Sequence, residues 1–176
     1  MDHEPKPRKH PNVIHIDEAP AREGNQGKFA FKSKRLWPSV GGKQLACSWF
    51  EVPPGKQAFP HHFHSAFEES IYILEGRGSA RIGENLVEVG VGDYIAFPPG
   101  PDTAHSLFNT GDTPLRYLCM STLHTLDIVV YPDSKKVAIA AGVDPAKGLM
   151  SGPSWVLKIV PLDQPSLGYY DGEEDA

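Results

Sequence analysis

Three side chains that can bind a metal ion lie within eight residues of one another, in the stretch from Pro53 to Gly76. They are His62, His64 and Glu69. Two histidines at positions i and i+2 of an extended backbone point to the same face of a strand, so their imidazole nitrogens can converge on one ion. Nitrogen and carboxylate ligands without a thiolate suit a first-row transition ion. This stretch therefore predicts a metal site.

A fourth candidate ligand, His105, follows a proline- and glycine-rich turn further along the chain. Three histidines and one glutamate favour one divalent transition-metal ion: iron, manganese, nickel, cobalt or zinc. An octahedral ion with four protein ligands keeps two positions open, where a small oxygenated substrate can displace water and be polarised. We therefore expect a small-molecule ligand or substrate at this site and leave the proton-transfer residue open.

At these two stretches the sequence resembles the cupin superfamily. The family's first motif, His-x-His followed by a glutamate and, after six residues, a glycine, is met by His62, His64, Glu69 and Gly76. Its second motif is met by Gly92, Pro98, Gly100, His105 and Asn109. The resemblance covers residues 40–125. It implies an all-β, antiparallel double-stranded β-helix, the jelly-roll or cupin barrel, with the metal held by His62, His64, Glu69 and His105.

The two stretches depart from the cupin motifs in places, and they contain residues that compete with the expected ligands. The leading Gly55 is spaced for His61 as first ligand, but a phenylalanine stands two residues after His61, so we expect this histidine behind the ligands or facing solvent. Glu68 competes with Glu69, and only Glu69 keeps the six-residue gap to the glycine. Four residues separate Gly100 from His105, where two are common in the family, which implies a wider loop over the site.

Composition supports the same fold class. The 17 glycines and 17 prolines separate short runs rich in branched and aromatic residues, which is typical of strands joined by turns. A length of 176 residues suits one domain. We expect an N-terminal extension over 1–39, the barrel over 40–125, and a C-terminal extension over 126–176. The last should contain a hairpin outside the barrel and an acidic tail.

The pattern of the central strands gives more detail. Residues 70–75 are expected to form a hairpin with residues 79–83, and the turn at 83–85 to begin a second hairpin. Ile71 and Ile73 should share the face of Glu69 and, with Leu107, form the walls of the pocket. Residues 70–75 are apolar on both faces, which calls for cover by a second sheet or a partner subunit. A homodimer is therefore expected.

Charge and hydropathy exclude several partner classes. The formal charge of −5 argues against nucleic acid, and no stretch approaches the ~20 apolar residues of a membrane span. The N-terminus lacks the apolar region of a signal peptide, so we expect a cytoplasmic protein. Lys32, Lys34 and Arg35 are interpreted first as a solvated cluster, and second as a contact for a phosphate or carboxylate. The basic side chains that could bind an anionic substrate if they point inward are Arg77, Arg81, Arg116 and Lys56.

The resemblance implies two classes of function. In the first, the protein is a metal-dependent enzyme acting on a small oxygenated metabolite, by sugar or uronate isomerase-like or lyase-like chemistry, or as an iron-dependent dioxygenase. In the second, the barrel is a non-catalytic binding or sensor module. The enzyme hypothesis is preferred, because no DNA-binding segment accompanies the cupin motifs.

Overall fold

The computed structural model describes residues 9–144 and 154–173. Regular structure in these ranges is β-strand, apart from three short 3-10 helices, η1 (Ile16–Glu18), η2 (Pro38–Val40) and η3 (Pro101–Thr103). The strands are β1 (Ala21–Gln26), β2 (Phe29–Arg35), β3 (Leu45–Val52), β4 (Phe63–His64), β5 (Glu69–Glu75), β6 (Arg77–Ile82), β7 (Asn85–Gly90), β8 (Tyr94–Phe97), β9 (His105–Asn109), β10 (Leu115–Thr122), β11 (Leu126–Tyr131), β12 (Lys136–Ala141) and β13 (Val156–Pro161).

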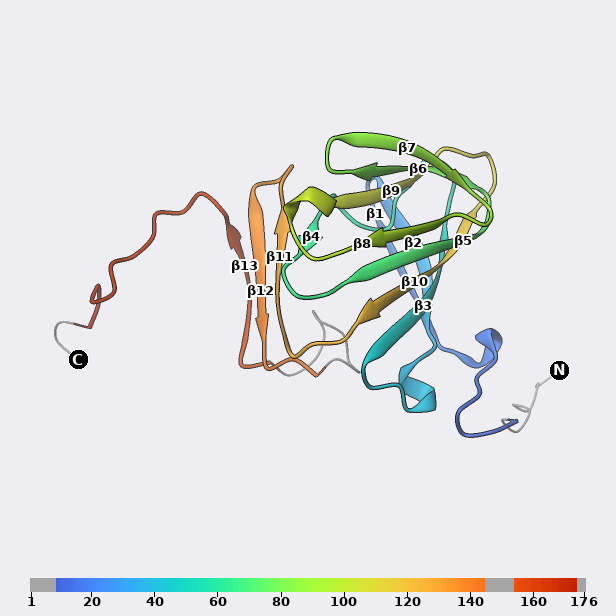
Figure 1. Cartoon of the computed structure of the whole chain (residues 1–176), viewed down its shortest axis with the longest axis horizontal. Helices are drawn as coiled ribbons and strands as arrows, with labels where there is room; N and C mark the ends of the chain where they lie inside the picture. Colours follow the sequence, from blue (N-terminus) through green and yellow to red (C-terminus); the bar gives the residue numbers. More distant parts are fainter. Residues whose placement is uncertain (1–8, 145–153, 174–176) are drawn as a thin grey trace.

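The strands form three antiparallel sheets (Figure 1). The largest has the order β1-β2-β3-β10-β5-β8, a second has the order β7-β6-β9, and a third has the order β13-β12-β11-β4. One core cluster draws on the first two sheets, with Val52, Ile73 and Leu115 from the larger and Ala80 and Leu107 from the smaller. Both sheets therefore cover the same apolar interior. The predicted all-β barrel fold is confirmed.

Strand β5 carries one of the candidate ligands into that interior. Ile71 and Ile73 are 6% and 0% exposed, whereas Tyr72 between them is 40% exposed. Side chains alternate along a strand, so Glu69 lies on the same inward face as the two isoleucines. The predicted cover over the other face is incomplete, because Ser70 is buried there while Tyr72 is exposed.

The predicted hairpin between residues 70–75 and 79–83 is wrong. β5 pairs with β10 and β8, and β6 pairs with β7 and β9, so the chain changes sheets at Gly76. Gly76 has a φ of 84°, and a Cβ there would lie 2.8 Å from the carbonyl oxygen of Pro114. A residue with a side chain would be strained in this conformation and would clash. The second predicted hairpin is present as β6–β7.

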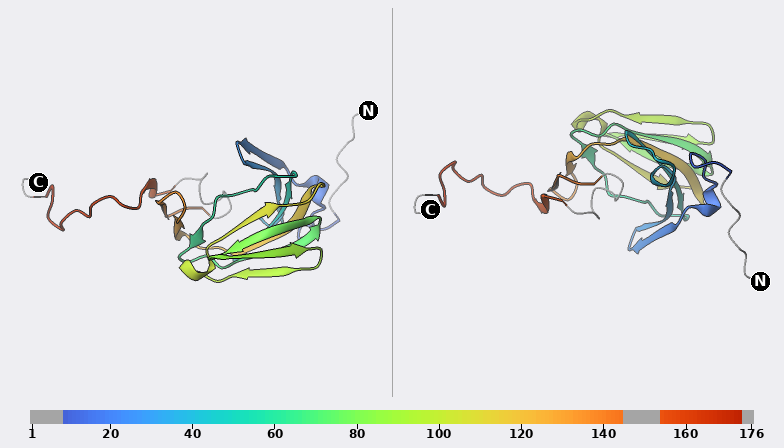
Figure 2. Two further views of the ribbon diagram at one scale, coloured as in Figure 1. Left: turned by 90° about the horizontal axis from the view of Figure 1, so that it is seen from above. Right: turned by 90° about the horizontal axis from the view of Figure 1, so that it is seen from below.

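Segments on both sides of the motif region pair with its strands. β2 adds to the largest sheet by pairing with β3, and β11 pairs with β4, which carries His64. Residues 126–131 belong to a sheet separate from the two that enclose the core, and β11 also contributes to the site described below. The β1–β2 hairpin projects from the body, and the chain after β13 runs away from it (Figure 2). Residues 174–176 of the acidic tail lie outside the described ranges. Within those ranges, no helix could cross a membrane.

Candidate metal centre

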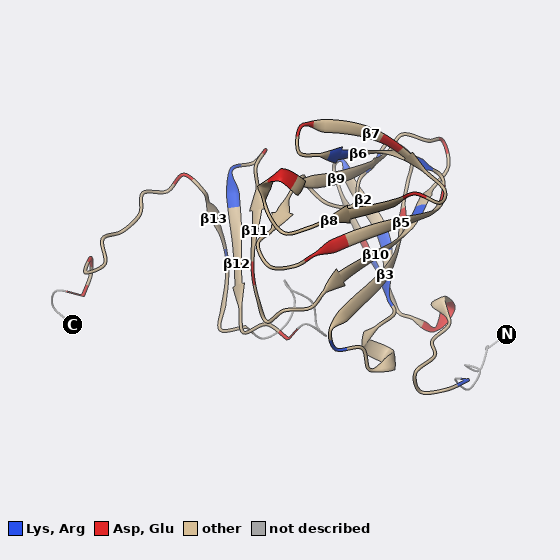
Figure 3. Cartoon of the chain, in the orientation of Figure 1, with Lys and Arg blue, Asp and Glu red and all other residues tan. Residues whose placement is uncertain are grey.

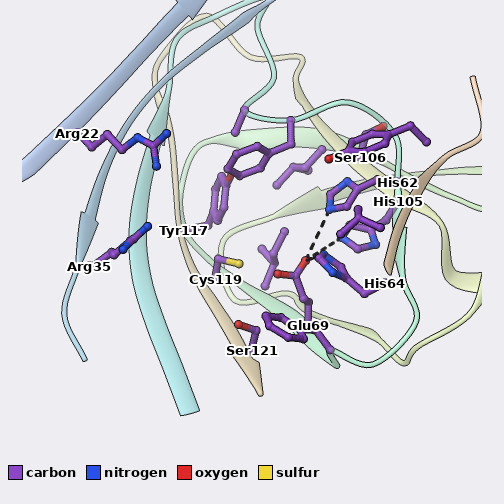
Figure 4. A pocket seen from close by; sticks show the side chains of 17 residues that line it. Arg22, Arg35, His62, His64, Glu69, His105, Ser106, Tyr117, Cys119 and Ser121 are labelled. Carbon is purple, nitrogen blue, oxygen red and sulfur yellow. Dashed lines mark ion pairs between the residues drawn. The ribbon is translucent and has the colours of Figure 1, made fainter. Parts of the chain in front are cut away.

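The backbone brings the two histidine segments together. His62 and His105 form an antiparallel bridge, in which the His62 amide donates to the His105 carbonyl at 3.0 Å and the His105 amide donates to the His62 carbonyl at 2.7 Å. His64 follows on β4, and Glu69 is the first residue of β5. Three short segments therefore meet, and the four side chains that they carry point toward a common centre (Figure 4).

The carboxylate of Glu69 lies at the middle of this group. Its Oε2 is 3.9 Å from Nε2 of His62, 3.4 Å from Nε2 of His64 and 3.3 Å from Nε2 of His105. His62, Glu69 and His105 each offer a ligand atom within 4.8 Å of the other two, a group that could hold a metal ion. His64 does not belong to that triple, yet its Nε2 approaches the same oxygen.

Each imidazole is held through its other ring nitrogen. Nδ1 of His62 lies 2.8 Å from the carbonyl oxygen of Pro60, and Nδ1 of His105 lies 3.0 Å from the carbonyl oxygen of Thr103. Carbonyl oxygens only accept, so these Nδ1 atoms carry the protons. When the His62 and His105 rings are neutral, the lone pairs on their Nε2 atoms are free to bind a metal. Both lone pairs point toward Glu69. This arrangement fits an ion bound through three nitrogens and one oxygen.

The third imidazole has a carboxylate behind it. Nδ1 of His64 lies 2.5 Å from Oδ2 of Asp127, a fully buried residue of β11. The other oxygen of Asp127 accepts from the Ser65 amide at 3.2 Å, the Ser65 hydroxyl at 3.2 Å and the Ala66 amide at 3.0 Å. These bonds fix the carboxylate, and the carboxylate fixes the His64 ring. A carboxylate–histidine pair of this kind raises the basicity of the ligating nitrogen.

Aromatic contacts set the planes of the same rings. The His105 ring stacks on Phe97 with 3.7 Å between centroids, and the His64 ring stacks on Phe67 at 5.5 Å. Tyr131 of β11 stacks on His62 at 5.9 Å. The rings thus have little freedom to turn away from the common centre.

The electrostatics of the metal-free centre depend on this network. Burial disfavours charge on His64, but the carboxylates of Glu69 and Asp127 outweigh it and raise the pKa of His64 to about 10. Burial likewise opposes ionisation of Glu69, but the surrounding histidines, His64 first, hold its pKa well below the usual range. Burial and then the neighbouring His105 lower the pKa of His62 to about 4. The metal-free centre at neutral pH therefore holds a charged His64 and a neutral His62.

A cavity of about 330 Å³ opens beside the four side chains. Burial raises the pKa values of Tyr117 and Tyr131 in its lining, and it raises the pKa of the Cys119 thiol, so these groups are protonated at neutral pH. The lining consists of Arg22, Arg35, Ala58, Phe59, His62, His64, Phe67, Glu69, Ile71, His105, Ser106, Leu107, Tyr117, Cys119, Ser121, Val129 and Tyr131.

Comparison with known proteins identifies the fold. Residues 48–121, which include all four side chains, match the family model of the cupin domain. The predicted oxalate decarboxylase of Thermotoga maritima has the same fold, with 25% identity, 64% of this chain and 99% of that chain covered, and a TM-score of 0.55. The protein contains a cupin domain.

Other similar proteins extend the comparison. A putative sugar phosphate isomerase from Acidithiobacillus ferrooxidans shares 21% identity over 90% of this cupin and 97% of its own chain, with a TM-score of 0.75. A sugar phosphate isomerase of the cupin superfamily from Silicibacter pomeroyi shares 20% identity over 89% of this chain and 97% of its own, with a TM-score of 0.71. An uncharacterised protein of Methanocaldococcus jannaschii is 43% identical over 70 residues, 40% of this chain. The match spans about half, 54%, of that relative's length.

The structure brings together the four side chains that the sequence nominated for the metal. Of the predicted walls, Ile71 and Leu107 line the cavity of this cupin, whereas Ile73 lies in the core. The rival Glu68 is exposed. His61 is neither solvent-facing nor behind the ligands: it is 5% exposed and lines a different cavity.

Sequence reasoning missed Asp127, although an aspartate inside the apolar run LDIVVY could have signalled a buried, paired carboxylate. The cations in the described lining are Arg22, which the sequence did not single out, and Arg35, for which a phosphate or carboxylate contact was the second interpretation. Of the four basic residues that the sequence offered for an anionic substrate, three bond to groups outside this cavity: Arg81 to Asp133, Arg116 to Glu51 and Glu75, and Lys56 to the Gly27 carbonyl.

Proposed function

We propose that this cupin is a metal-dependent enzyme that acts on a small oxygenated metabolite. The observation that carries the proposal is the convergence of the four donors: the Nε2 atoms of three histidines, whose Nδ1 atoms are occupied by fixed acceptors, lie 3.3–3.9 Å from one oxygen of Glu69. Such a set suits one divalent ion, iron, manganese, nickel, cobalt or zinc. His62, His64, Glu69 and His105 would hold it.

The bound ion would supply Lewis acidity toward a hydroxyl or carbonyl oxygen of the substrate. The chain contributes the surroundings. Ile71, Leu107 and Phe67 give the cavity apolar walls that limit water around the reacting group. Tyr117 and Tyr131 are kept protonated by burial, so their hydroxyls can donate hydrogen bonds to substrate oxygens. These roles fit chelation and polarisation of a hydroxy-carbonyl compound.

Isomerase-like or lyase-like chemistry is the form of this activity that we favour. Both reactions move a proton next to a carbonyl, a step that polarisation of the carbonyl oxygen assists. Two proteins of the same fold are described as sugar phosphate isomerases, but their low identity supports the fold alone. The reaction class therefore rests on the chemistry of the donor set and is decided by experiment.

A cobalt-loaded sample provides that experiment. The ligand-field bands of Co²⁺ should shift when uronates, sugar phosphates or 2-oxo acids are titrated, because their oxygens would enter the coordination sphere. Product formation is measured on the same sample. Bands that no probe shifts, with no turnover, would contradict the proposed activity. The His61→Ala protein is a matched control that should behave as the parent.

A binding module is the second candidate, and one observation favours it. Apart from the four metal donors, the described lining of the cavity offers only arginine, tyrosine, serine and cysteine as titratable or hydroxyl groups. Burial raises the pKa values of both tyrosines and of the cysteine, so none of these three is a base at neutral pH. Shifted cobalt bands without turnover of any probe would select this function over the enzyme.

A further inference from the structure

Two arginines line the same cavity as the metal donors. Arg22 comes from β1 and Arg35 from β2, the hairpin at the edge of the largest sheet. Figure 4 shows both side chains on the side of the cavity away from the histidines, with Tyr117 and Cys119 drawn between the two groups. Neither side chain is fully buried, and both line the cavity, so a ligand there can contact both guanidinium groups.

The register of the hairpin explains why both arginines face inward. Arg22 pairs with Ser33, and Arg35 is two residues beyond Ser33, so the arginines are diagonal neighbours on one face of the hairpin. Phe31 lies on that face too, and its ring contacts the core ring of Phe50 at 5.8 Å. The face that carries the arginines is therefore the one turned toward the barrel interior.

The opposite face of β2 gives a natural contrast. Lys32 stands there, paired in register with Glu23 of β1, and the two side chains form an ion pair at 3.7 Å. The register thus places basic residues on both faces of the strand, and Figure 3 colours the lysine and arginine positions of the ribbon blue. On the outer face, Lys32 is next to a carboxylate, whereas on the inner face Arg35 stands diagonally to another arginine.

The electrostatics of the cavity favour an anion. Burial, and then the charge of Arg22, lower the pKa of Arg35, yet an arginine remains protonated at any ordinary pH. Glu69 is the one carboxylate in the described lining, and it belongs to the donor set. Two guanidinium groups, together with a divalent ion once one is bound, would outweigh the single charge of Glu69 and make the cavity attractive to an anion. Guanidinium forks match the oxygens of phosphates and carboxylates in geometry as well as charge.

We infer that Arg22 and Arg35 bind the anionic group of the substrate, a phosphate or a carboxylate, while its hydroxy-carbonyl end lies at the four metal donors. This inference rests on the proposed function and narrows it. The substrate class becomes small hydroxy-carbonyl compounds with an anionic substituent.

Three related probes test the inference on the full-length, cobalt-loaded protein. Dihydroxyacetone is a neutral hydroxy-ketone, dihydroxyacetone phosphate carries a phosphate on the same skeleton, and hydroxypyruvate carries a carboxylate. Calorimetry should show at least one anionic probe binding ten times or more tightly than dihydroxyacetone. The anion that is preferred identifies the substituent.

Substitutions then assign the preference to residues. Arg22→Gln and Arg35→Gln should each weaken binding of the preferred anionic probe about tenfold, because each removes a charge-assisted hydrogen bond. Binding of dihydroxyacetone should stay within twofold. Lys32→Gln removes one positive charge from the outer face of the same strand and should change neither affinity. The cobalt content of every variant is measured first and shows that the fold and the metal centre persist.

The outcomes separate this inference from the proposed function. If the Arg22→Gln/Arg35→Gln protein binds both anionic probes as tightly as the parent, the arginine subsite is wrong, whatever the cobalt bands do. If none of these probes, and none of the uronates, sugar phosphates and 2-oxo acids, shifts the cobalt bands of the parent or is turned over, the proposed function is wrong. Inorganic phosphate then still tests the arginine pair, which predicts at least tenfold tighter binding to the parent than to the double variant. Equal loss for neutral and anionic probes would also overturn the subsite, because it would indicate a general change of the cavity.

Discussion

His61 and His62 are neighbours in the chain, and both are buried, yet they belong to different cavities. Nδ1 of His62 has an acceptor 2.8 Å away, and its Nε2 points at Glu69. Nδ1 of His61 has no hydrogen-bond partner among the described residues, and its cavity, which we call the outer cavity, contains Arg81 and Asp133. A histidine becomes a candidate ligand when an acceptor fixes one nitrogen and other donors meet the second. Burial alone does not make it one.

The largest difference between the metal centre and the outer cavity should appear when a candidate metal ligand is removed. His64→Ala deletes a nitrogen donor and leaves the buried Asp127 without its imidazole, so we expect the parent to carry one metal ion per chain and the variant to carry less than a tenth as much. His61→Ala, the neighbouring histidine of the outer cavity, should keep full occupancy. Elemental analysis of protein purified without chelator measures both. Equal metal content in the two variants would show that His64 is not a ligand.

A second comparison uses two carboxylates, Asp127 beside the metal centre and Asp133 in the outer cavity. Asp127→Asn keeps the size of the side chain but removes the charge that supports His64, so metal affinity should fall about 10- to 100-fold. Asp133→Asn changes the outer cavity, where this carboxylate bonds Arg81 at 2.9 Å, and should leave metal affinity unchanged. Competition with a chelator of known affinity gives both values. An Asp127→Asn protein with the parent's affinity would mean that the His64–Asp127 bond does not tune the centre.

Metal affinity should also depend on pH. The pKa of His64 is raised to about 10 in the metal-free protein, and a ligating imidazole must be neutral, so below that pH each bound ion displaces one proton. Affinity should therefore rise about tenfold per pH unit between pH 7 and 9. His62, with its pKa lowered to about 4, is already neutral and adds no further dependence in this range. Calorimetry in two buffers of different ionisation enthalpy should report about one released proton at pH 7.5; a value of zero would contradict a charged His64.

The sequence could predict three of the converging donors, His62, His64 and Glu69, from their spacing within eight residues, and the fourth, His105, from the resemblance of its motif to the second cupin motif. His62 and His64 share one face of an extended segment, and Glu69 and His105 are each the first residue of a strand. Asp127 could not be placed in this way, since it is 63 residues from His64 and meets it only through the pairing of β11 with β4. That pairing is long-range and leaves no periodic signal in the chain.

The two other misses have the same physical origin. The turn at Gly76 has the composition of a hairpin, but its positive φ and its close approach to Pro114 serve a crossing between sheets. Arg22 and Arg35 reach the cavity because the β1–β2 register places them diagonally on the inward face. Composition indicates where a turn or a charge occurs. Register and sheet order decide which side of the barrel it faces.

The smallest expected effect concerns the unpaired nitrogen of His61. Its side chain is buried, and Nδ1 lacks a hydrogen-bond partner among the described residues, a condition that destabilises the folded state. His61→Leu replaces the imidazole with an apolar side chain and removes the unpaired atom, so we expect the free energy of unfolding to rise by about 1 kcal/mol or less. Metal content should not change, because His61 lies outside the donor set. Urea unfolding of parent and variant measures the difference. A loss of stability larger than about 1 kcal/mol would show that the His61 side chain has a polar partner in the outer cavity. His61 and His62 would then differ in the kind of partner that they have, and no longer in whether they have one.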